Sequence, residues 1–326
     1  MPMKKMLTAG MSAVMLLVLI LDGQAALQSA SDGILLCLHT VIPSLFPFLF
    51  LCSLITSSMW GEPIPWLRHI ADRLGIPAGG ESLLVSAFLG GYPAGAQAIG
   101  ACFREGYLSR HDAQRLLPVC NNAGPAFLFG MVALQFARAD TVAALWLIQI
   151  LATLFVSIIS ADSTEHTVSL TGNATPISEI LIRSVRIMAT ICGWIILFQI
   201  LIGFMVRWVL WLFPQDLQIM LKGLLELSSG CCQLHQIIST DLRFLICTVQ
   251  LSFGGICVMM QTASVIGDLS MARYFRGKLV QTAASAIMAA FYLQWGWPFL
   301  VCAGAVVLFF PIRMKNGCRF SPLRGV

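Results

Sequence analysis

Long apolar runs separated by short polar connectors fill most of the chain. They lie at about residues 6–27, 31–59, 82–103, 116–137, 141–160, 184–213, 217–239, 243–266, 279–295 and 297–312. Several approach the roughly 20 residues that a helix needs to cross the hydrocarbon core. None alternates apolar and polar residues with a period of two, as the strands of a membrane barrel do. The pattern predicts an all-α polytopic membrane protein.

Two of the apolar runs are interrupted by residues that break helices. Residues 82–103 contain Gly90, Gly91, Pro93 and Gly95, and residues 217–239 contain Glu226 followed by Ser228-Ser229-Gly230. Backbone that leaves the helix at membrane depth persists only where protein or water satisfies its polar groups. We therefore expect two re-entrant hairpins, near residues 90–97 and 226–233, beside about 8 transmembrane helices. If both runs cross fully, the chain has about 10 spans.

The distribution of basic residues favours the hairpin alternative. With two hairpins, most of the 20 lysines and arginines, Lys278 among them, fall on one side of the membrane. The positive-inside rule makes that side cytoplasmic. The sequence thus predicts a multi-pass protein of a bacterial inner membrane with both termini in the cytoplasm, and a first helix that is retained rather than cleaved.

The two halves of the chain resemble each other. GGYPAGAQ (90–97) and NNAGPAFLFG (121–130) in the first half correspond to ELSSGCCQ (226–233) and LSFGGICVMMQT (251–262) in the second. This alignment pairs Gly95 with Gly230 and Gly124 with Gly255. Since one hairpin would enter from each side, we expect an inverted repeat whose broken helices meet at the midplane, a build typical of secondary transporters.

The resulting organisation has six parts. We predict an N-terminal transmembrane helix (1–30), a first repeat (31–160), a polar linker (161–181), a second repeat (182–266), C-terminal helices (279–312) and a basic tail (313–326).

Composition narrows the possible functions. The chain is 58% hydrophobic and 11% charged, and its net charge of +5 comes from short basic clusters between apolar runs. That arrangement suits membrane orientation and argues against a nucleic-acid partner. The 11 cysteines show no CxxC spacing, so we expect no metal. No paired intramembrane acids, HExxH or usable GxSxG occur, so we expect neither an enzyme nor a cofactor.

Glu226 is the first candidate for solute binding, because an ionisable group at membrane depth requires a partner or water. Alternatively it pairs with Lys222 one helical turn away. Asn121 and Asn122 are buried amides that either bind a solute or join helices. Polar residues close to the breaks complete the predicted substrate site, namely Ser228, Ser229, Gln97 and Gln250. The predicted turn residues are Gly90, Gly91, Pro93, Gly95, Gly124, Gly230, Gly254 and Gly255.

Four stretches also carry a resemblance to a known family. They are IPSLFPFLF (42–50), GGYPAGAQ, REGYLSRHDAQRL (104–116) and NNAGPAFLFG. With them the chain resembles the sporulation integral membrane proteins of the YlbJ type, whose membrane domain is classed with the nucleoside-recognition or Gate domains. The resemblance implies an inner-membrane protein needed for the spore coat or cortex, related to nucleoside transporters and to the membrane part of ferrous-iron transporters.

Two functions remain open at this stage. The first is a permease-like protein that binds a small polar solute between the two repeats. The resemblance suggests a nucleoside, although no residue pattern in the chain does. The second is a non-transporting component of spore assembly that acts through sporulation proteins or a second copy of itself. Both place the protein in the lipid bilayer.

Overall fold

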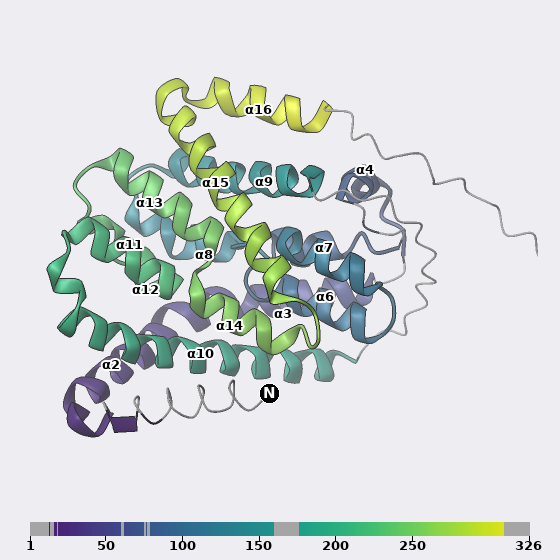
Figure 1. Cartoon of the computed structure of the whole chain (residues 1–326). Helices are drawn as coiled ribbons and strands as arrows, with labels where there is room; N and C mark the ends of the chain where they lie inside the picture. Colours follow the sequence, from purple (N-terminus) through teal and green to yellow (C-terminus); the bar gives the residue numbers. More distant parts are fainter. Residues whose placement is uncertain are drawn as a thin grey trace, which may run out of the picture.

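The computed structural model describes residues 13, 16–17, 19–59, 62–74, 76, 79–159 and 176–309. Within these residues every regular element is a helix (Figure 1). The start of the predicted first helix, most of the predicted linker (160–175) and the predicted basic tail lie outside the described residues.

Four described helical segments are long and apolar enough to cross a membrane. The first, Gly23–Ser58, consists of α2 (Gly23–Leu36), a π-helical turn (Cys37–Val41) and α3 (Ile42–Ser58). The second is α9 (Ala139–Ile159) and the third is α10 (Ile177–Trp208). The fourth, Thr240–Val265, joins α13 (Thr240–Phe253) to α14 (Gly255–Val265). These segments agree with the prediction of an all-helical membrane protein.

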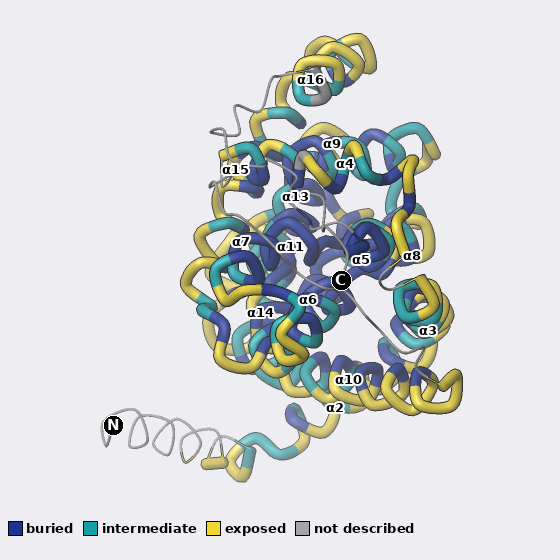
Figure 2. The backbone as a smooth tube through the Cα atoms, turned by 90° about the vertical axis from the view of Figure 1, so that its right-hand side faces the viewer, coloured by how far each residue is buried: buried dark blue, intermediate teal, exposed yellow. Residues whose placement is uncertain are grey.

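Shorter helices fill the centre of the molecule. The first half contributes α5 (Leu83–Phe88), α6 (Ala94–Arg104), α7 (Arg110–Cys120) and α8 (Pro125–Gly130). The second half contributes α11 (Gln215–Leu225) and α12 (Leu227–Cys231). Figure 2 shows α5 dark blue at the centre, whereas α10 and α2 lie side by side along one edge. Buried helices of six to eleven residues, such as α5 and α6, are too short to cross a bilayer alone.

Two further helices follow the second half. Helix α15 (Met271–Trp295) packs on α9 and α13, and α16 (Trp297–Phe309) packs on α9 and α15. Gly296 separates them with a φ of +66°, a conformation that glycine adopts readily. Helix α16 is largely exposed at the edge of the molecule (Figure 2).

Several predicted boundaries shift in the structure. The predicted limit between residues 30 and 31 lies inside α2, and residues 177–181 of the predicted linker form the start of α10. Helix α15 begins at Met271, eight residues before the predicted apolar run at 279. Because the first residues of α15 include exposed polar side chains, hydropathy alone predicts a start of the helix that is too late in the chain.

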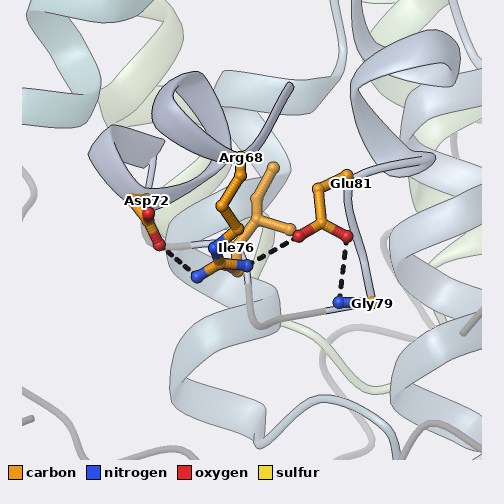
Figure 3. A network of polar contacts seen from close by, with 5 residues as sticks. All are labelled: Arg68, Asp72, Ile76, Gly79 and Glu81. Atoms are coloured by element: carbon orange, nitrogen blue, oxygen red, sulfur yellow. Dashed lines mark hydrogen bonds and ion pairs between the residues drawn. The ribbon is translucent and has the colours of Figure 1, made fainter. Parts of the chain in front are cut away.

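An amphipathic helix, α4 (Pro65–Leu74), lies between two predicted apolar runs. A network of polar contacts fastens it to the start of α5 (Figure 3). The Arg68 guanidinium donates to Glu81 Oε1 at 2.8 Å and also pairs with Asp72, and the backbone N–H of Gly79 donates to Glu81 Oε2 at 2.9 Å. Since the Glu81 side chain is fully buried, these contacts compensate its lost hydration.

Candidate functional site

In the first half, two breaks in helical structure touch each other. Helix α7 ends at Cys120, and α8 begins at Pro125, which lacks the N–H that a first helical position leaves unused. The other break is the turn between α5 and α6, where Gly91 has a φ of +74°. A Cβ on Gly124 would lie only 2.8 Å from the Gly91 nitrogen. The two segments therefore pack backbone against backbone.

The second half contains a corresponding pair of breaks. Gly254 and Gly255, with φ of +82° and +84°, separate α13 from α14. The second break is at Glu226, between α11 and α12. A Cβ on Gly255 would lie 3.1 Å from the Gly223 carbonyl oxygen, so these two segments are also in close contact.

The remaining predicted turn residues permit close helix packing. A Cβ on Gly95 would lie 1.6 Å from the Cys120 carbonyl oxygen, and one on Gly230 would lie 2.2 Å from the Gly223 Cα. A Cβ on Gly90 would lie 2.8 Å from the Ser86 carbonyl oxygen, and Pro93 caps α6. Each position thus excludes a side chain or begins a helix.

The two halves meet at these breaks. The Tyr92 hydroxyl donates to the Leu251 carbonyl oxygen at 3.2 Å, and Asn121 Nδ2 donates to Thr262 Oγ1 at 2.9 Å. A cavity of about 30 Å³ lies at this junction, lined from the first half by Gly91, Tyr92 and Gly124 and from the second by Glu226, Ser228 and Gln261. That volume has room for only a couple of water molecules.

Glu226 acts as the cap of a helix. Its carboxylate accepts the backbone N–H of Ser228 at 3.0 Å, and both the backbone N–H and the hydroxyl of Ser229 at 2.6 Å. The residue is 2% exposed. Within the described residues it forms no ion pair with Lys222, whose Nζ donates instead to Gln233 Oε1 at 2.9 Å. An N-terminal carboxylate satisfies backbone donors that the helix leaves unpaired.

Asn121 and Asn122 belong to a separate polar network. Asn121 Nδ2 also donates to the Tyr274 hydroxyl at 2.9 Å, and its Oδ1 accepts the Ala96 N–H at 3.3 Å. Asn122 Oδ1 accepts from Gln281 Nε2 at 2.8 Å and from Thr153 Oγ1 at 3.2 Å. Asn121 thus ties the end of α7 to α6, α14 and α15, and Asn122 ties it to α9 and α15.

Lys278 is the charged member of this network, and the sequence did not identify it as a site residue. The side chain is fully buried, although the charge count assigned it to the cytoplasmic surface. Its Nζ donates to Gln281 Oε1 at 2.7 Å, the Asn121 carbonyl oxygen at 3.2 Å and Asn122 Oδ1 at 3.4 Å. It also lies 5.0 Å from the centre of the Tyr92 ring. Every acceptor in this set is uncharged.

The two glutamines predicted for the substrate site lie in different surroundings. Gln250 Nε2 donates to the Ile219 carbonyl oxygen at 2.9 Å, and the side chain fills the space beside Gly223 and Gly230. Gln97 instead lines a second cavity of about 230 Å³ on the other side of the α5–α6 turn.

This larger cavity, called the polar cavity below, is rich in hydroxyl groups. Its lining includes Ser53, Thr56, Ser57, Ser86, Gln97, Glu105, Tyr107 and Arg183. Thr56 and Ser86 are joined by a hydrogen bond of 2.9 Å. Among the described residues, the Gln97 amide and the Ser57 hydroxyl have no protein partner. The polar cavity therefore presents free donors and acceptors, whereas the Glu226 carboxylate in the small cavity is bonded to Ser228 and Ser229.

The predicted substrate residues consequently fall into separate places. Glu226 and Ser228 line the small cavity and Ser229 completes its cap. The two asparagines lie in the Lys278 network, Gln97 lines the polar cavity, and Gln250 packs within the second half. The described residues contain no group of three or more His, Cys, Asp or Glu side chains that could hold a metal ion.

One curated protein provides a comparison over most of the chain. The chain is 25% identical, over 333 aligned positions, to the sporulation integral membrane protein YlbJ of Bacillus subtilis (strain 168), and the match covers 85% of this chain and 81% of that protein. No family model and no solved structure matches the chain significantly. The similarity and the four apolar helices identify an integral, multi-pass membrane protein distantly related to YlbJ.

Proposed function

We propose that this protein is a permease-like membrane protein that binds a small polar solute in the polar cavity. The observation that carries the proposal is the free Gln97 amide and Ser57 hydroxyl in a cavity of about 230 Å³. Drug-sized ligands occupy pockets of roughly 300–1,000 Å³, so the solute is smaller than these. The class of solute is uncharged or zwitterionic, because Glu105 and Arg183 offer both signs of charge in the lining.

The break residues supply the proposed means of movement. Gly91 and Tyr92 line the small cavity at Glu226, and Ala94, two residues after Tyr92, lines the polar cavity. We propose that the two halves are inverted repeats and that rocking of one against the other opens a path past the turn between α5 and α6. The matching order of broken helices in the two halves supports this idea. A relationship to the Gate domains would also be consistent with this proposed movement of the two halves.

The similarity to YlbJ gives the proposal a cellular setting. The name of that protein describes a role in sporulation, and we propose the same setting for this chain. A nucleoside as solute remains part of the proposal through the family resemblance.

A second function is favoured by the packing at the midplane. The cavity at the junction holds only about 30 Å³, and Glu226, Asn121 and Asn122 all have protein partners. A closely packed midplane whose polar groups are hydrogen-bonded is what we expect of a non-transporting membrane component of spore assembly. Such a protein would act through sporulation proteins or a second copy, by its cytoplasmic loops.

Ligand-induced stabilisation of the full-length protein distinguishes the two functions. Purified protein is heated with nucleosides, nucleobases, amino acids or dicarboxylates, beside Gln97→Leu and a matched control, Gln28→Leu, on the exposed face of α2. A bound solute at 100 times its Kd adds about 2.7 kcal/mol to the free energy of unfolding. We expect one solute class to stabilise the native protein and the control equally, and Gln97→Leu much less. If no class stabilises any of the folded forms, the assembly function is the better account.

A further inference from the structure

A further cavity, of about 440 Å³, lies between α7, α9 and α15 and shares no lining residue with the polar cavity. Helix α7 contributes His111, Gln114, Arg115 and Pro118, and α15 contributes Arg273, Arg276, Gly277 and Val280. Both sets have the spacing i, i+3, i+4, i+7, which places them on one face of each helix. Val156 and Ile159 at the end of α9 complete the lining. We call this cavity the basic cavity.

The lining changes from basic to apolar toward the C-terminal ends of α7 and α15. On α15, Arg273 and Arg276 precede Val280 by one to two turns, and on α7 Arg115 precedes Pro118. Ile159 and Val280 are 59% and 41% exposed, so the apolar part of the lining is open to the surroundings of the protein. A ligand that fits the basic and the apolar parts of the lining must carry an anionic group and an apolar chain.

The charges in the basic cavity all have the same sign. No Asp or Glu is among its lining residues; the carboxylate of Asp112, next to His111 in the chain, is buried and lies 3.8 Å from His111 Nδ1. Arg115 is held in place because its Nη1 donates to the Leu74 carbonyl oxygen at 2.7 Å. Arg273 and Arg276 are exposed. Guanidinium groups bind phosphate oxygens with two parallel hydrogen bonds, which an ammonium cannot do.

We propose that the basic cavity binds the phosphate group of an anionic phospholipid, with an acyl chain lying against Val156, Ile159 and Val280. Basic pockets between transmembrane helices are known to hold anionic lipid headgroups at the cytoplasmic face. The end of the molecule that carries these arginines is also the end that the positive-inside rule assigns to the cytoplasm. This proposal does not depend on solute binding in the polar cavity.

The test uses full-length protein in detergent, with residual lipid removed, and measures binding through the melting temperature. The probes are dioctanoyl phosphatidylglycerol, dioctanoyl phosphatidylcholine and inorganic phosphate. The variant is Arg276→Gln, and its matched control is Arg186→Gln, an exposed arginine on α10 that is outside the cavity. Because both arginines are exposed, we expect both variants to fold.

We expect phosphatidylglycerol to bind the native protein and the control with the same Kd, and Arg276→Gln about fivefold more weakly. That factor corresponds to about 1 kcal/mol for one basic residue beside an anionic headgroup. Three results would overturn the proposal: equal binding of phosphatidylcholine, equal weakening in the two variants, or binding of inorganic phosphate without binding of the lipid. If Arg276→Gln fails to fold, Arg273→Gln is measured in its place with the same control.

Discussion

The ammonium group of Lys278 lies 3.2 Å from the carbonyl oxygen of Asn121, at the break between α7 and α8. Asn121 is the first residue after α7, so its carbonyl group does not take part in a continuous helix. A residue 157 positions later thus satisfies the backbone of the first broken helix. This contact couples α15, which lies outside both predicted repeats, to the junction between them.

Replacing Lys278 with methionine tests whether this contact stabilises the fold. The change leaves the Asn121 carbonyl and Gln281 Oε1 buried without their donor, which costs about 1–3 kcal/mol. We expect a lower melting temperature for Lys278→Met than for Lys222→Met, since Lys222 is only partly buried and makes one hydrogen bond. A higher melting temperature for Lys278→Met would mean that burying the cation costs more than its hydrogen bonds contribute.

Glu226→Gln tests the helix-cap role of the carboxylate. One of the two oxygens is replaced by an NH₂ group, so the backbone donor of either Ser228 or Ser229 loses its acceptor and the buried cap is weakened. We expect a destabilisation of about 1–2 kcal/mol, measured by thermal or chemical unfolding.

The matched control is Ser239→Ala, which removes the cap of α13 at an exposed position. There water replaces the lost oxygen, and the cost should be nearer 0.5 kcal/mol, at the lower end of cap substitutions. An equal or larger loss at Ser239 would contradict the cap role of Glu226. Glu226→Gln also tests ligand binding. If a solute raises the melting temperature of Glu226→Gln as much as that of the native protein, the carboxylate is not part of the binding site.

Gly95→Ala tests the close approach of α6 to α7. The new Cβ would lie 1.6 Å from the Cys120 carbonyl oxygen, so one helix must move. Overpacking of this kind costs up to about 3 kcal/mol, and we expect little folded protein in a size-exclusion profile. Gly193→Ala on α10 is the control, because nothing lies within 4 Å of its Cβ. Folding of both variants in similar yield would show that α6 can move away from α7 at little cost.

The sequence predicted the helical breaks better than it predicted their partners. Gly90, Gly91 and Pro93, and the Ser-Ser-Gly run after Glu226, are local signals, because a break depends on the conformational preferences of the residues that form it. The same holds for the left-handed glycines at 254 and 255. Hydropathy likewise located the long helices, since lipid requires an apolar stretch of fixed length.

The burial of Lys278 could not be predicted in this way. The residue stands next to an apolar run, where a lysine ordinarily marks the membrane surface. Its acceptors Asn121 and Asn122 are more than 150 residues away, so only the fold brings them together. The one local signal was Gln281, a second polar residue one turn later on the same helix. The polar cavity could not be predicted for the same reason. Ser53 and Ser57 lie on α3 and Gln97 lies on α6, so only the fold brings them together.

Cysteine accessibility tests the proposed inverted arrangement of the two halves. Glu105 lies in the connector between α6 and α7, and Ile238 lies in the corresponding connector between α12 and α13, where it is 94% exposed. If the halves are inverted, these connectors face opposite sides of the membrane. If the halves are parallel, or if the runs 82–103 and 217–239 both cross fully, the two connectors face the same side of the membrane.

The experiment labels Glu105→Cys and Ile238→Cys in intact cells with a membrane-impermeant maleimide. The exposed native Cys302 is replaced by serine in both variants, and the Cys302→Ser protein alone measures background labelling of the other cysteines. We expect Ile238→Cys to react from outside and Glu105→Cys to react only after the cells are opened. Labelling of both from the same side would contradict an inverted repeat, because two connectors at equivalent positions of inverted halves cannot share a compartment.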